Sequence, residues 1–176
     1  MKIIFIFSII FVLAQSTWSN TELKDFTIKT TSNESINLES YSKNLTLVVN
    51  IATRCGYTGQ LEDIEKLYKM YKDQGLKVIG IPSNEFAGQT PESDQEVSKF
   101  CRLKYGTTFP ISKKSVITGE KKIALYKYLI NKTDKKEIQW NFTKFLIGKN
   151  AKSIKRFEPN ISPLDPVLIK AIKDEL

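Results

Sequence analysis

Residues 45–58 read LTLVVNIATRCGYT, and this stretch decides the fold. Its first nine residues are rich in β-branched and apolar side chains, which is typical of a strand buried on both faces. Beyond it, apolar side chains recur at helical spacing, at Leu61, Ile64, Leu67, Tyr68 and Tyr71. A second apolar run, residues 76–82, follows Gly75. This strand–helix–strand order predicts a parallel βαβ unit with a right-handed crossover.

The rest of the chain predicts further strands and helices around this unit. Short strands at 26–28 and 36–38 predict an N-terminal hairpin. Ser93 and Glu96 form a capping box that begins a second helix. Later patterns predict strands at 116–118, 145–147 and 153–157, and helices at 124–131 and 164–173. We expect one α/β domain, with a central mixed sheet flanked by helices.

Composition excludes several classes of site. The chain of 176 residues has no histidine, so it contains no Cys-His or Ser-His-Asp catalytic system. With only Cys55 and Cys101 besides, we expect no metal site. The formal charge of +8 comes from lysines spread along the chain rather than from a basic block mixed with aromatics, so we expect no nucleic-acid partner.

Both ends of the chain resemble targeting signals. Residues 1–19 combine a charged start, an apolar stretch and small residues, which predicts a secretory signal peptide, with residues 20–176 as the mature domain. The apolar stretch is shorter than the roughly 20 residues of a spanning helix, so we expect no stable membrane insertion; a signal anchor is the alternative. The last four residues, Lys173, Asp174, Glu175 and Leu176, match the endoplasmic-reticulum retention signal. We expect a lumenal protein whose accessible glycosylation sites are Asn33 and Asn131.

Cys55 is the first candidate for chemistry. It follows the apolar strand and precedes the helix, where the helix dipole and unpaired N–H groups favour a thiolate. Arg54 adds a neighbouring positive charge. A buried structural cysteine is the alternative, and position alone leaves both open.

Other polar groups lie near expected strand ends. Gln89 follows the second strand, and Trp140 and Asn141 precede a later one. Ends of strands converge at the carboxyl edge of an α/β sheet, and these amides and the indole N–H can hydrogen-bond a thiolate or a peroxide oxygen. Each residue could instead have a structural role: Gln89 as a polar group of a loop, Trp140 as a core aromatic and Asn141 as a turn residue.

Several ordered motifs carry a family resemblance. They are CGYT (55–58), PSNEFAGQTP (82–91), FC (100–101) with YGTTFP (105–110), WNFTKF (140–145) and RFEP (156–159). Together they resemble the glutathione peroxidase family across nearly the whole mature chain. The resemblance implies a thioredoxin-like fold, reduction of hydroperoxides, and a catalytic tetrad that falls on Cys55, Gln89, Trp140 and Asn141.

The resemblance also implies how the enzyme is recharged. Cys55 stands where many animal members carry selenocysteine, and Cys101 matches the resolving cysteine of two-cysteine members. Those members are usually reduced by thioredoxin-like proteins, for which protein disulfide isomerase is the lumenal candidate. We expect no cofactor beyond this thiol reductant. Ser83, Glu85 and Thr90 depart from the usual family residues, and the short stretch before Trp140 lacks the loop of tetrameric members, so we expect a monomer.

Two other functions stay open on the sequence. One is a one-cysteine peroxidase that uses glutathione and never employs Cys101; the other is a non-catalytic thioredoxin-like binding module. For the two-cysteine cycle, Cys55 should face solvent, whereas Cys101 shares an apolar helix face with Val97, Phe100 and Tyr105. A disulfide between them should therefore require local opening of that helix.

Overall fold

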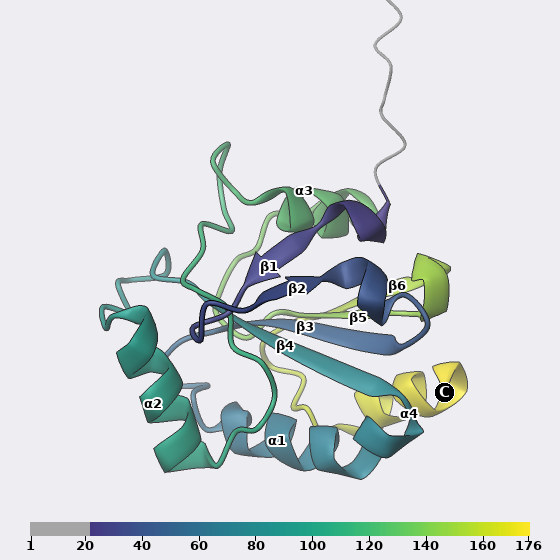
Figure 1. Cartoon of the computed structure of the whole chain (residues 1–176), viewed down its shortest axis with the longest axis horizontal. Coiled ribbons are helices and arrows are strands. Elements are labelled where there is room, and N and C mark those ends of the chain that lie inside the picture. Colours follow the sequence, from purple (N-terminus) through teal and green to yellow (C-terminus); the bar gives the residue numbers. More distant parts are fainter. Residues whose placement is uncertain (1–21) are drawn as a thin grey trace, which may run out of the picture.

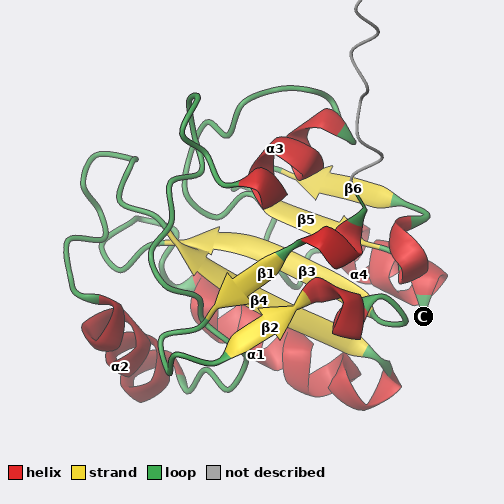
Figure 2. Ribbon diagram, turned by 45° about the horizontal axis from the view of Figure 1, so that its top comes forward, coloured by secondary structure: helices red, strands yellow, loops and turns green. Residues whose placement is uncertain are grey.

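A four-stranded mixed sheet forms the centre of the molecule in the computed structural model, which describes residues 22–176. The strand order is β4-β3-β5-β6 (Figure 2). Strand β3 (Leu45–Ile51) runs parallel to β4 (Leu76–Pro82), as the βαβ pattern predicts. Strand β5 (Lys144–Ile147) is antiparallel to β3 and to β6 (Ile154–Phe157). The predicted signal peptide lies outside the described residues.

Helices cover both faces of this sheet, as Figure 1 shows. Helices α1 (Gln60–Tyr71) and α4 (Pro166–Glu175) lie on one face. Helix α3 (Ala124–Asn131) and the hairpin of β1 (Thr27–Lys29) and β2 (Ser35–Asn37) lie on the other. Helix α2 (Asp94–Tyr105) stands at the side and contributes to the core shared with α1. The predicted flanking helices and N-terminal hairpin are therefore confirmed.

The alternation of side chains along β3 explains this layering. All seven of its residues are buried. Leu47 and Val49 face the core under α1 and α4, while Val48 faces the core under α3. A continuous apolar run is what a strand with two covered faces requires. The strand thereby carries the chain to the sheet edge where Cys55 follows.

Helix α2 is bounded by strong caps but has a small buried face. Ser93 accepts a hydrogen bond from the Glu96 N–H, and Glu96 accepts one from the Ser93 N–H, as the predicted capping box requires. Gly106 ends the helix with φ 65°, in the left-handed region that favours glycine. Of the twelve residues of α2, only Val97 and Cys101 are buried.

Two sequence predictions need correction. The predicted strand at 116–118 is wrong, because the N–H groups of Ile117 and Thr118 donate to the Glu85 carboxylate, at 2.5 and 3.0 Å, instead of to a neighbouring strand. The closing helix begins and ends two residues later than predicted, since Asp165 caps it and Pro166 occupies its first turn. No helix within residues 22–176 is long and apolar enough to cross a membrane.

Candidate active site

The turn after β3 holds Cys55 through Thr58. The Cys55 N–H donates to Thr58 Oγ1 at 2.9 Å, and Thr58 Oγ1 donates to the Ala52 carbonyl at 3.0 Å. This places the Tyr57 N–H 3.4 Å from Cys55 Sγ, so a main-chain donor points at the sulfur. The arrangement can hold a charged sulfur without any titrating partner.

One expectation for this turn is wrong, and the structure adds a partner to the other. Cys55 was expected to face solvent, but it is only 7% exposed because its side chain packs into the core of α1 and α4. The positive charge predicted from Arg54 lies next to Cys55 in the chain, but its Nε lies 2.8 Å from Glu92 Oε1. The guanidinium charge beside Cys55 is therefore paired with a carboxylate.

Gln89 and Asn141 are brought together by the fold. Asn141 Nδ2 donates to Gln89 Oε1 at 2.9 Å, and Asn141 is fully buried. The Gln89 carbonyl accepts hydrogen bonds from the N–H groups of Thr53 and Arg54, at 3.2 and 3.0 Å. These bonds join the loop of Gln89 to the residues directly before Cys55. Residues 52 positions apart in the chain thus meet at one edge of the sheet.

Trp140 lies at the surface of the same region. It is 37% exposed, and its ring packs against Phe86 with the ring centroids 5.9 Å apart. Its carbonyl accepts hydrogen bonds from Asn50 Nδ2 and Thr143 Oγ1, each at 3.2 Å. Phe86 belongs to the loop that also carries Gln89, so the indole rests on that loop. The Trp140 carbonyl is therefore held by β3 and by Thr143, the residue before β5.

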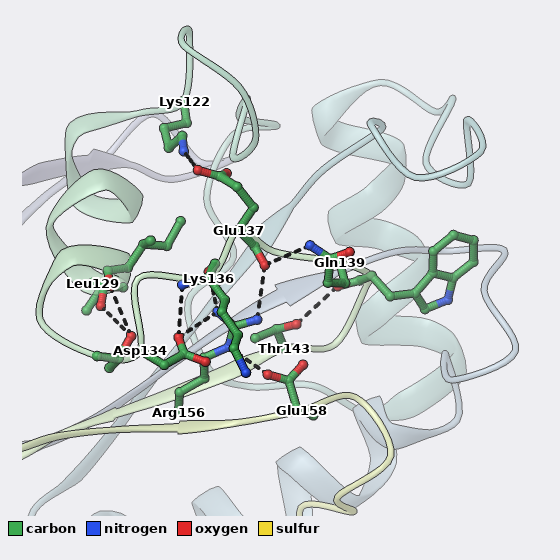
Figure 3. Close-up of polar contacts among 12 residues, drawn as sticks. Lys122, Leu129, Asp134, Lys136, Glu137, Gln139, Thr143, Arg156 and Glu158 are labelled. Carbon is green, nitrogen blue, oxygen red and sulfur yellow. Dashed lines mark hydrogen bonds and ion pairs between the residues drawn. The ribbon is translucent and has the colours of Figure 1, made fainter.

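Arg156 on β6 fixes the segment that leads into Trp140 (Figure 3). The Arg156 side chain is only 6% exposed. Its Nη1 donates to Asp134 Oδ1 at 3.1 Å and to the Lys136 carbonyl, and its Nη2 donates to the Glu137 carbonyl at 3.2 Å. Its Nε lies 2.8 Å from a Glu158 carboxylate oxygen. A rigid guanidinium fork suits this multiple acceptor set better than an ammonium does.

Replacing Arg156 by methionine should misplace Trp140. We expect a loss of stability of roughly 1–2 kcal/mol, since the variant loses several hydrogen bonds whose acceptors are exposed to solvent. In folded protein we also expect a shift in Trp140 fluorescence and faster hydrogen exchange in residues 134–140. Lys155→Met, on the neighbouring position of β6, is the control. Unchanged fluorescence and exchange in Arg156→Met would show that Arg156 does not hold this segment.

Lys144 is a buried charged residue that sequence reasoning missed. Its Nζ donates to the Ile161 carbonyl at 2.6 Å and to the carbonyls of Glu158 and Pro159, each at 3.4 Å. Burial lowers the pKa of Lys144 to about 8. Gln60 Nε2, at the start of α1, donates to the same Pro159 carbonyl at 2.7 Å. A lysine inside the apolar run of β5 was the signal that could have revealed it.

Cys101 lies on the buried face of α2, as predicted. It has no exposed surface, and burial raises its thiol pKa to about 12. Cys55 and Cys101 are both free thiols in this structure. Cys101 is therefore protonated and inaccessible in the closed fold.

Several solved structures share this architecture. Trgpx, solved in its apo form, superposes with TM-score 0.68 at 30% identity, covering 88% of this chain and 97% of its own. GPX1 of T. cruzi gives 0.67 at 29%, covering 88% and 94%. A thioredoxin-family thiol:disulfide interchange protein from Chlorobium tepidum gives 0.62 at 17%, covering 85% and 92%, a likeness of fold alone. The fold is thioredoxin-like, and Cys55 lies at the turn between β3 and α1.

Sequence comparison gives the family. The glutathione peroxidase family profile matches residues 15–130. The glutathione peroxidase homolog BsaA of Staphylococcus aureus is 39% identical over 143 residues, or 80% of this chain and 90% of its own. Glutathione peroxidase-like peroxiredoxin 2 of Saccharomyces cerevisiae is 39% identical over 149 residues, or 81% and 91%. The chain belongs to the glutathione peroxidase family and is a peroxidase of the oxidoreductase class.

Proposed function

We propose that this peroxidase reduces hydrogen peroxide and organic or lipid hydroperoxides through Cys55 and serves in the response to oxidative stress. The observation that carries the proposal is the hydrogen bond between Asn141 and Gln89, together with the main-chain bonds that tie Gln89 to the residues before Cys55. These contacts support a shared site for the sulfur and the two amides. Trp140, resting on the Gln89 loop through Phe86, is the fourth proposed member.

In the first step the Cys55 thiolate attacks a peroxide oxygen. A sulfur–oxygen bond forms while the oxygen–oxygen bond breaks, so the sulfur becomes a sulfenic acid and the peroxide is reduced to water or an alcohol. The proton released from the thiol ends on the leaving oxygen. Gln89, Trp140 and Asn141 offer N–H groups that orient the peroxide and do not titrate.

In the second step the Cys101 thiol condenses with this sulfenic acid. A disulfide forms and water leaves, and a dithiol protein then reduces the disulfide by thiol exchange. A thioredoxin-like protein, or protein disulfide isomerase in the lumen of the endoplasmic reticulum, is the proposed reductant. A one-cysteine cycle that uses glutathione is the second candidate, and the complete burial of Cys101 is the observation that favours it.

Peroxide consumption measured with three reductants in parallel tests the proposal. A thioredoxin system, protein disulfide isomerase and glutathione are each supplied with hydrogen peroxide or a lipid hydroperoxide. We expect turnover with the dithiol proteins and little with glutathione. Turnover with glutathione alone would establish the one-cysteine cycle, and no consumption with any reductant would refute the proposed chemistry.

We also propose that the protein is a monomer of the endoplasmic-reticulum lumen. The retention signal at its C-terminus is part of α4 rather than a free tail. Glu175 accepts a hydrogen bond from Ser153 Oγ at 2.7 Å and pairs with Lys155, and the Leu176 carbonyl accepts one from Lys149 Nζ at 2.7 Å. Reading of the signal by its receptor therefore requires the last turn of α4 to unwind.

Extending the chain by two alanines after Leu176 should release the protein into the medium. The extension removes the signal from the terminus but keeps the contacts of α4, unlike deletion of the last four residues. We expect both variants to be secreted and the intact chain to be retained. Equal secretion of the intact and extended chains would show that the last four residues form the end of a helix and do not act as a retention signal.

Glycans in that compartment should avoid the proposed site. Asn33, at the tip of the hairpin, and Asn131, at the end of α3, are exposed. Asn141 also lies in an acceptor triplet, but it is fully buried and bonded to Gln89. We propose that only Asn33 and Asn131 carry sugar, which mass spectrometry of the glycopeptides would test.

A further inference from the structure

We propose that Glu92 is a positioning residue for this reaction: its carboxylate, bound to Thr53 and Arg54, fixes the main chain that holds Gln89 beside Cys55. This inference rests on the proposed function of Cys55 and Gln89. Glu92 lies three residues after Gln89, in the loop between β4 and α2.

The carboxylate of Glu92 joins two consecutive residues that directly precede Cys55. Glu92 Oε2 accepts a hydrogen bond from Thr53 Oγ1 at 2.6 Å, and Glu92 Oε1 accepts one from Arg54 Nε at 2.8 Å. Burial alone would raise the pKa of Glu92, but the hydrogen bonds from Thr53 and Arg54 outweigh it and hold this pKa below its usual value. Glu92 is therefore ionised at neutral pH and can accept both bonds at full strength.

The Thr53 hydroxyl has one proton, so the Glu92 carboxylate determines which acceptor receives its hydrogen bond. Thr53 Oγ1 lies 3.1 Å from the Gln89 carbonyl as well as 2.6 Å from Glu92 Oε2. A hydroxyl donates only one hydrogen bond, and the charged, nearer acceptor takes it. The Gln89 carbonyl is then held by the N–H groups of Thr53 and Arg54 alone. If Glu92 lost its charge, the hydroxyl would be free to turn to the Gln89 carbonyl.

Gln89 is thus held at both its main chain and its side chain. The main-chain N–H groups of Thr53 and Arg54 hold the Gln89 carbonyl, and Asn141 Nδ2 holds the side-chain oxygen. Lys114 anchors the far side of the loop, since its Nζ donates to the Glu92 carbonyl at 2.5 Å and to the Thr90 carbonyl at 3.1 Å. A shift of the main chain at Thr53 and Arg54 would move the Gln89 side-chain amide relative to Cys55. Even a small displacement of groups that act on the substrate lowers the reaction rate.

The competing explanation is that the Glu92–Arg54 pair acts through its charge near Cys55 and not through the position of Gln89. The Arg54 side chain is 64% exposed, so its pairing with Glu92 also sets the local charge. If charge alone mattered, Glu92→Gln and Arg54→Met would change the peroxide rate in opposite directions. If positioning matters, Glu92→Gln, Thr53→Val and Arg54→Met should all slow the reaction, and Arg54→Met should slow it least because the Arg54 side chain is 64% exposed.

The test measures the rate constant for oxidation of reduced Cys55 by hydrogen peroxide in the full chain. We expect a loss of about tenfold in Glu92→Gln and in Thr53→Val, the size of one lost hydrogen bond to a charged group. Arg54→Met should slow the reaction by about twofold, since its bond to Glu92 is exposed to solvent. Glu120→Gln, an exposed glutamate with no side-chain partner among residues 22–176, is the matched control. Side-chain amide NMR signals of Gln89 and Asn141 should shift in these three variants and stay unchanged in Glu120→Gln.

The outcomes separate this inference from the proposed function. Unchanged rate and unchanged Gln89 signals in Glu92→Gln would overturn the positioning role, as would opposite changes in Glu92→Gln and Arg54→Met. A wild-type chain in which Cys55 does not react with peroxide would instead refute the proposed function. The NMR signals would still report in that case whether Glu92 fixes Gln89.

Discussion

Cys55→Ser should abolish peroxide consumption, with a loss of roughly a thousandfold or more, as expected for removal of a nucleophile. A serine hydroxyl stays protonated and lacks the nucleophilicity of a thiolate. The fold should persist, because Thr58 holds the turn through the main-chain N–H of residue 55 and the Ala52 carbonyl, and neither bond uses the sulfur. The measurement is peroxide consumption together with trapping of sulfenic acid by mass spectrometry.

Cys101→Ser serves as the control for this experiment. It removes the other free thiol and leaves the turn of Cys55 intact. Sulfenic acid should still form on Cys55 in this variant after one equivalent of peroxide. Full turnover in Cys55→Ser, or sulfenic acid that maps to Cys101 in the wild type, would show that Cys55 is not the peroxide-reacting thiol.

Under steady turnover, Cys101→Ser should lose all activity that depends on dithiol proteins. The reason is that Cys55 sulfenic acid would have no resolving thiol inside the chain. In the wild type, peroxide should produce one intramolecular disulfide and faster hydrogen exchange in α2. Unchanged dithiol-dependent turnover in Cys101→Ser would reduce Cys101 to a core residue and favour the glutathione cycle.

The opening of α2 that this cycle requires should cost little. Only Val97 and Cys101 of its twelve residues are buried, whereas α1 buries five. Few buried apolar contacts make a helix a candidate for local unfolding below the global free energy. The capping box of Ser93 and Glu96 opposes this opening by about 1 kcal/mol. Ser93→Ala should therefore raise hydrogen exchange in α2 of the reduced protein.

High pH should also favour the open state of α2. Burial raises the pKa of Cys101 from an ordinary value near 9 to about 12 in the closed fold. A raised pKa means that the closed state is fully stabilised below pH 9 and loses this stability as the pH rises toward 12. We expect α2 to exchange hydrogen faster across that range in the wild type than in Cys101→Ser, which has no thiol to ionise.

The sequence by itself determined the framework of this protein. The continuous apolar run of β3 and the helical spacing of α1 are local patterns, so their boundaries could be predicted within about two residues. The caps of α2, Ser93 with Glu96 and then Gly106, are also local signals, since each concerns residues within one turn. The proposal that Cys55, Gln89, Trp140 and Asn141 form one site came only from the resemblance to a family, because spacing alone was equally consistent with a structural role for each residue.

Tertiary structure decided which partners these residues have. No local pattern shows that Glu85 takes the N–H groups of residues 117 and 118 and so removes a predicted strand. No local pattern shows that Glu92 pairs with Arg54, which lies 38 residues earlier in the chain. The burial of Cys55 likewise depends on the packing of α1 and α4 around its turn. Long-range hydrogen bonds and ion pairs depend on where the chain returns in space, whereas periodicity and capping depend only on neighbours along it.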